Sequence, residues 1–162
     1  GNRIALVTYS GAQAIMAIDA AIQSGLGLAD FGPDTRMKIA EVIATDAKSK
    51  NPIDIFPDMM AHGFEKTITR ILSALFEDPG VHGIILISFA QEGAEMHQPV
   101  VDVWRQYRSK PLFVSLMGVQ KDIRACGDFF LDNEVPFFPF PETGVHVFKH
   151  MWQVAAQKKR RD

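Results

Sequence analysis

The sequence has a single cysteine, Cys126, so it cannot form a disulfide within the chain. No apolar run approaches the roughly 20 residues that a membrane-spanning helix needs, and no basic segment leads into an apolar signal segment. The formal net charge is only −2, which gives no reason to expect nucleic acid as a partner. These absences predict a cytoplasmic protein that binds neither a membrane nor nucleic acid.

The composition is that of an ordinary globular domain. Of the 162 residues, 47% are hydrophobic and 22% are charged, which suffices to bury one core. We expect residues 1–156 to form a single domain and residues 157–162 to form a basic tail or linker. The chain starts at Gly1 and enters its first strand by about residue 3, which is typical of a domain that belongs to a longer protein.

Strand and helix patterns alternate along the chain, with no hairpin signal between strands. The predicted strands are residues 4–7, 51–57, 83–89, 112–116 and 135–141. The predicted helices are residues 14–22, 34–44, 63–76, about 99–107, about 119–130 and 142–157. This alternation predicts a three-layer α/β domain, a doubly wound parallel sheet of about five strands in the flavodoxin-like order.

The first turn of the chain carries the clearest site signal. This opening turn, residues 8–13, reads Thr-Tyr-Ser-Gly-Ala-Gln and joins a buried strand to an alanine-rich helix, of which Ser10 is the expected N-cap. Free N–H groups and the helix dipole favour an anion at such a helix start, so Ser10, Gly11 and Ala12 are candidate phosphate-binding residues. The alternative is an ordinary strand-to-helix turn, because the spacing matches neither a P-loop nor a G-x-G-x-x-G fingerprint.

The remainder of the predicted site follows from the sheet. Ligands of doubly wound sheets bind at the carboxyl ends of the strands, which places Tyr9, Asp54 and Gly118 at the site edge. The sequence offers no convincing metal site: His146 and His150 lie four residues apart on one helix, where a solvated face is the favoured interpretation.

Several other residues are interpreted as structural. Cys126 occupies an apolar helical position and is expected in the core. Asp19 is expected either to be a buried acid or to hydrogen-bond a neighbouring loop, with the hydrogen bond favoured. Asn51 is expected to bond its own backbone at a strand entry. The methionines expected to serve in packing are Met16, Met59, Met60 and Met151.

A series of short motifs, in order, resembles one known family. They are residues 1–8 (Gly-Asn-Arg-Ile-Ala-Leu-Val-Thr), Ser10-Gly11, Asp19-Ala20-Ala21, Gly25-Leu26, Asn51-Pro52-Ile53-Asp54, Lys110-Pro111, Val135-Pro136 and Pro141-Glu142. They are similar to a flavodoxin-like ligase domain of the NDP-forming acyl-CoA synthetases, the ADP-forming acetate–CoA ligase type related to succinyl-CoA synthetase. The resemblance covers the chain to about Val154.

The resemblance implies a part of a larger enzyme that interconverts acyl-CoA and ATP through an acyl phosphate and a phosphohistidine. It implies that the opening turn supports phosphate transfer, and that the parent enzyme uses CoA, ATP or ADP, and Mg²⁺. The implied partners are CoA-binding, histidine-bearing and ATP-grasp domains or subunits. None of His62, His82, His97, His146 and His150 has the family's phosphohistidine context, so no catalytic residue is assigned to this chain.

The sequence also departs from the family pattern. Tyr9 and Ala12 stand where the family commonly has asparagine and glycine, and the loop at residues 89–93 lacks an expected proline. Two alternatives therefore remain open: a flavodoxin-like module that binds FMN for electron transfer, and a catalytically silent scaffold or regulatory domain of a fused protein.

Overall fold

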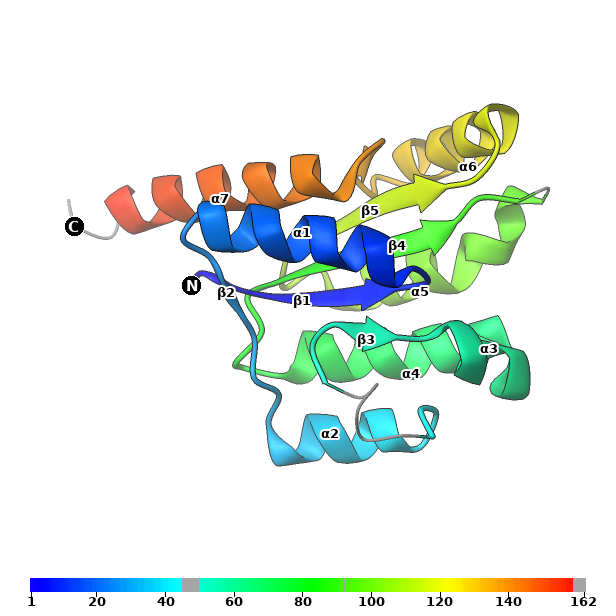
Figure 1. Cartoon of the computed structure of the whole chain (residues 1–162), viewed down its shortest axis with the longest axis horizontal. Helices are drawn as coiled ribbons and strands as arrows, with labels where there is room; N and C mark the ends of the chain where they lie inside the picture. Colours follow the sequence, from blue (N-terminus) through cyan, green and yellow to red (C-terminus); the bar gives the residue numbers. More distant parts are fainter. Residues whose placement is uncertain (45–49, 92, 159–162) are drawn as a thin grey trace.

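In the computed structural model, which describes residues 1–44, 50–91 and 93–158, a parallel sheet is flanked by helices (Figure 1). The strands of these residues are β1 Arg3–Thr8, β2 Gly27–Leu28, β3 Ile53–Asp54, β4 Gly83–Phe89, β5 Leu112–Met117 and β6 Phe137–Phe138. The helices are α1 Gly11–Gln23, α2 Pro33–Ala40, α3 Phe56–His62, α4 Phe64–Glu77, the 3₁₀ helix η1 Ala94–His97, α5 Gln98–Tyr107, α6 Gln120–Asp132 and α7 Pro141–Lys158.

The predicted strand order is confirmed, with one strand more than the five expected. The sheet follows the order β2-β1-β4-β5-β6, and β3 also pairs with β1. Strand β2 pairs with the start of β1 (Arg3 with Gly27), whereas β3 pairs with its end (Thr8 with Asp54). The outer neighbour of β1 is thus divided into two short strands, and together they hold the second position of the flavodoxin-like order.

Asn51 connects these two short strands along the edge of β1. Its Oδ1 accepts a 2.9 Å hydrogen bond from the Leu6 N–H, and its Nδ2 donates to the Ile4 carbonyl at 2.8 Å and the Ala29 carbonyl at 3.0 Å. The expectation that Asn51 would bond its own backbone is therefore wrong. The side-chain amide instead satisfies backbone groups that a continuous strand would have paired.

The sheet has a core on each face. Helices α1 and α7 lie side by side on one face, whereas α2, α4 and α5 lie on the other (Figure 1). Alternate residues of β1 supply the two cores: Ile4 and Leu6 contact the α1 and α7 side, and Ala5 and Val7 contact the opposite side. Both faces of β4 are covered, as its uninterrupted apolar sequence predicts.

Several elements differ in their bounds from the predictions. Helix α2 ends at Ala40 rather than residue 44, and its N-cap is Gly32, because Pro33 takes the first helical position. The predicted strands at residues 51–57 and 135–141 shrink to β3 and β6, and Pro57 lies in the first turn of helix α3 instead of closing a strand. Helix α7 continues to Lys158, while residues 159–162 of the predicted tail lie outside the described residues.

The environments of single residues both support and correct the sequence interpretation. Cys126 is fully buried, as predicted. Asp19 is exposed, so the interpretation as a buried acid is wrong. The interpretation of the methionines as packing residues is also wrong for Met16, Met60 and Met151, whose side chains are exposed. None of the described helices is long and apolar enough to cross a membrane.

Candidate functional site

The opening turn is held from below by the buried hydroxyl of Thr8. Its Oγ1 accepts a 2.9 Å hydrogen bond from the Ser10 N–H and donates to the Ser10 carbonyl at 2.8 Å. The Tyr9 N–H donates to the Ile87 carbonyl at 3.1 Å, which extends the contact between β1 and β4 by one residue. These contacts fix the turn at the carboxyl edge of the sheet, where the arrowheads of β1 and β4 end in Figure 1.

Ser10 is the N-cap of α1, as predicted. Its backbone is extended (φ −140°, ψ 116°), and its side chain accepts a hydrogen bond from the Gln13 N–H. Gly11 and Ala12 are exposed, and their N–H groups have no hydrogen-bond partner among the described residues. No acidic residue occupies the first turn of α1, so the positive end of the helix dipole remains unneutralised.

Gly11 also leaves open space in front of the turn. A Cβ atom built on this residue would meet no atom within 4 Å. No atom therefore blocks the side-chain direction of Gly11, and exposed, unpartnered N–H groups at a helix start have the chemistry of an anion site.

A second helix start lies at the same sheet edge. Helix α6 begins after Val119, which makes no side-chain capping bond. A hollow of about 550 Å³ is lined by residues of both helices, including Gln13 of α1 and Arg124 of α6, and by Gly118. The structure thus brings Gly118 and the opening turn to one edge, and it adds a cationic side chain, Arg124, that the sequence interpretation missed. Its position six residues after Gly118, in the helix that follows β5, was the available signal.

Gly118 has a structural reason to be glycine. Its φ is 149°, and a Cβ atom here would lie 2.6 Å from the Ala90 carbonyl oxygen. The turn after β5 therefore packs directly against the backbone that follows β4, which only glycine allows.

Asp54 and Tyr9 point away from the hollow in front of the turn. Asp54 Oδ1 accepts a 3.1 Å hydrogen bond from the Phe56 N–H, so this carboxylate fixes the start of α3. The Tyr9 ring packs against Phe64, with 6.2 Å between ring centroids, and its hydroxyl is buried near Ser88. Burial raises the pKa of Tyr9, against a smaller opposing effect of the Ser88 hydroxyl.

The core beneath the turn contains a histidine. His97 is fully buried, and its ring lies 5.8 Å from Phe64 and 5.0 Å from Phe130, measured between centroids. Burial lowers its pKa to about 4, and the Phe89 backbone offsets this only in part, so the imidazole is neutral at pH 7. The apolar spacing of His97, Val100, Val101 and Trp104 was the signal that places His97 on the inner face of a helix.

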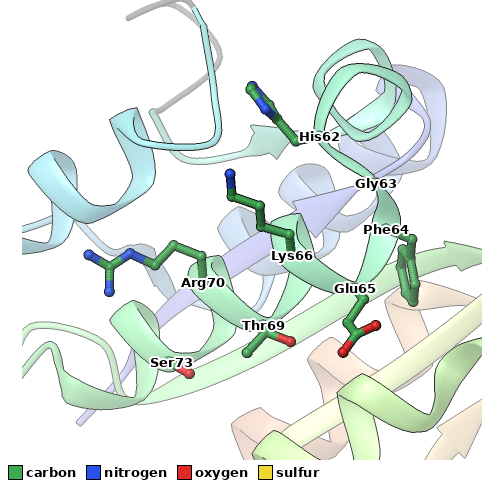
Figure 2. A pocket seen from close by; sticks show the side chains of 8 residues that line it. All are labelled: His62, Gly63, Phe64, Glu65, Lys66, Thr69, Arg70 and Ser73. Atoms are coloured by element: carbon green, nitrogen blue, oxygen red, sulfur yellow. The ribbon is translucent and has the colours of Figure 1, made fainter.

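Another hollow lies on the outer surface of α4. It has a volume of about 630 Å³ and is lined by His62, Gly63, Phe64, Glu65, Lys66, Thr69, Arg70 and Ser73. Figure 2 shows Lys66 and Arg70 on one side of the helix and Glu65 on the other. Arg70 is already paired with Glu41, whose pKa is lowered by that contact. This open, mixed-charge surface does not form a defined anion site.

His146 and His150 are exposed on α7, as a solvated helix face predicts. Among the described residues there is no group of three or more His, Cys, Asp or Glu side chains placed to hold a metal ion.

The fold defines a parallel α/β domain whose opening turn lies at the carboxyl edge of the sheet. The chain matches the family described as the Ligase-CoA domain over residues 4–160, and it belongs to this family. It is 38% identical over 163 aligned residues to acetate–CoA ligase [ADP-forming] II of Archaeoglobus fulgidus, covering 99% of this chain and 24% of that protein.

Two further comparisons agree with this assignment. Acetate–CoA ligase [ADP-forming] I subunit alpha of Pyrococcus furiosus is 24% identical over 164 aligned residues, which are 99% of this chain and 34% of that subunit. The fold matches the dinucleotide forming acetyl-coenzyme A synthetase 1 of Candidatus Korarchaeum cryptofilum, in complex with phosphate and ADP, with a TM-score of 0.79. That match is 20% identical and covers 96% of this chain and 33% of that one. The chain therefore spans about a quarter to a third of these proteins.

Proposed function

We propose that this chain is the ligase domain of an NDP-forming acyl-CoA synthetase and that its opening turn binds the phosphoryl group in transit. The observation that carries the proposal is the pair of exposed, unpartnered N–H groups of Gly11 and Ala12 at the start of a 13-residue helix. Amides and a helix dipole that are already oriented stabilise a developing phosphate charge without reorganisation.

In this proposal the domain supplies half of a site. The phosphoryl group arrives on a histidine of a neighbouring domain, and the opening turn stabilises it while it moves between that histidine and the acyl group. CoA, ATP or ADP, and Mg²⁺ are assigned to the parent enzyme and its CoA-binding and ATP-grasp domains. The names of the curated relatives, which are ADP-forming CoA ligases, support this assignment.

The geometry of the turn does not favour FMN binding. An FMN phosphate site in a flavodoxin-like turn relies on several hydroxyl groups, whereas here the Thr8 hydroxyl is buried and bonded to Ser10. The Tyr9 hydroxyl is buried, and the Ser10 hydroxyl caps Gln13.

Gly11→Asp in the full-length parent protein tests the role of the turn. An aspartate at the first position of α1 favours the helix dipole, so stability should be retained, but its charge repels an anion. We expect the turnover of acyl-CoA-dependent ATP formation to fall about 100-fold, the scale of losing a preorganised anion contact. The matched control is Gln23→Glu, which adds the same charge at the exposed far end of α1. Turnover unchanged by Gly11→Asp in a folded enzyme would refute the proposal.

A further inference from the structure

A second, apolar cleft lies at the same edge of the sheet, next to the opening turn. It has a volume of about 390 Å³. Its lining comes from the ends of β1, β4 and β5, from α3 and from the segment that follows β4: Tyr9, Phe56, Met59, Met60, Phe89, Gln91, Met96 and Met117. None of these lining residues is charged.

The apolar side chains at this cleft are unusually exposed. Phe56 is 55% exposed, Met60 is 75% exposed and Phe89 is 44% exposed. Single exposed apolar residues are common, but several gathered around one hollow indicate a binding surface.

The local structure holds these side chains at the cleft. The Asp54 carboxylate caps the Phe56 N–H and so fixes the first turn of α3 at the cleft. Strand β4 ends with Ser88 directed inward and Phe89 outward, as strand alternation requires. Gln91 Nε2 lies 3.0 Å from Met96 Sδ and holds that side chain in place. The rim is thus fixed, while the flexible methionines can adapt to a bound group.

The cleft and the opening turn share their borders. Tyr9 lines the cleft and directly precedes Ser10, and Met117 lines it and directly precedes Gly118. An uncharged lining does not compensate the desolvation of a carboxylate or phosphate, so the charged end of a ligand must lie outside the cleft. One ligand could therefore place its charged end at the N–H groups of Gly11 and Ala12 and its apolar end among the methionines.

The volume indicates the size of the apolar end. A cavity of about 150 Å³ lined by apolar side chains binds a benzene molecule. This cleft, at about 390 Å³, is larger than that cavity, so a single methyl group would leave most of it empty.

Resting on the proposed function, we infer that the cleft receives the hydrocarbon part of the carboxylic acid substrate, and that this part is a ring or a branched chain. The bound acid places its carboxylate, and then its acyl phosphate, at the opening turn. Phe56, Met60 and Phe89 then determine acid specificity rather than phosphate transfer.

The test compares three acids in the full-length parent protein: acetate, 4-methylpentanoate and 3-phenylpropanoate. In the unmodified enzyme we expect the two bulky acids to have the higher kcat/KM. Met60→Lys should lower kcat/KM for the bulky acids about tenfold or more, mainly through KM, and leave acetate nearly unchanged, because lost apolar contacts discriminate on this scale. Phe56→Ala should act in the same direction.

The control is Met37→Lys, which makes the same change at a methionine that is 64% exposed on α2. If no acid supports acyl-CoA formation from ATP and CoA, the proposed function fails. If acetate is used and Met60→Lys leaves the ratio between acids unchanged, the inference about the cleft fails while the proposed function stands. Equal loss for all acids, with weaker association of this domain with the rest of the enzyme, would make the cleft a domain contact and overturn the inference.

Discussion

At the scale of single residues, the backbone at the site edge is held in place by residues whose own side chains do not bind a ligand. Thr8 is buried under the opening turn and orients it through Ser10 without facing a ligand. Gly118 is constrained by the Ala90 carbonyl rather than by a ligand. The residues left to face a ligand at the turn are Gly11 and Ala12, through their backbone N–H groups, whose chemistry any sequence could supply.

The buried His97 predicts a pH dependence of stability. Its pKa in the folded protein is about 4, below the ordinary value of 6.5, so the unfolded chain takes up the proton first as the pH falls. Stability is therefore full above pH 6.5 and falls between pH 6.5 and 4, by about 3 kcal/mol for this group alone.

Urea unfolding of the wild type and of His97→Leu at pH 7 and pH 4.5 measures this contribution. The variant should lose much less stability on acidification than the wild type. His146→Leu, at an exposed position on α7, is the control and should retain the wild-type pH dependence. An equal pH dependence in all three proteins would show that His97 does not carry the effect.

At the scale of elements, a side chain at the edge of β1 makes backbone hydrogen bonds that a neighbouring strand would otherwise make. Strands β2 and β3 have two residues each, too few to pair the whole of β1. The Asn51 amide occupies the interval between them and bonds three backbone groups. The position of β3, and with it Asp54 and the start of α3 at the apolar cleft, depends on this residue.

Asn51→Ala should therefore be strongly destabilising. It leaves the Leu6 N–H and the carbonyls of Ile4 and Ala29 without their partner, which should cost about 3 kcal/mol in the free energy of unfolding. Asn2→Ala removes one longer, exposed amide contact to the Gly25 carbonyl, and should cost less than about 0.5 kcal/mol. Denaturant unfolding at pH 7 compares the two, and similar losses would contradict the bridging role of Asn51.

At the scale of the whole molecule, helix α7 packs closely against the sheet. Helix α7 lies close enough to β4 that a Cβ atom on Gly83 would be 2.4 Å from the Phe148 ring, which is buried. Gly83→Ala should therefore push α7 away and cost about 1 to 3 kcal/mol, the usual range for overpacking. Gly27→Ala is the control, because a Cβ atom there would meet only the Arg3 side chain at 3.7 Å. Thermal unfolding in which both variants behave alike would contradict this packing.

The sequence by itself determined the alternation of strands and helices, the flavodoxin-like order and the cap at Ser10. These depend on local patterns: uninterrupted apolar runs, helical spacing and a small polar residue before a helix. The same patterns placed Cys126 in the core. The sequence did not show the division of the β1 edge, because Asn51 acts on residues more than 40 positions away in the chain.

The tertiary structure alone decided how the candidate site is built. In the sequence, Met59 and Met60 look like packing residues, and Met117 gives no signal. The three methionines line one cleft only because β1, β3, β4 and β5 end at the same edge of the sheet. Arg124 lines the hollow beside Gln13 and Gly118 for the same reason. A parallel sheet gathers distant turns at its carboxyl edge, so the sequence locates the edge, whereas the charge and shape of the space there depend on packing.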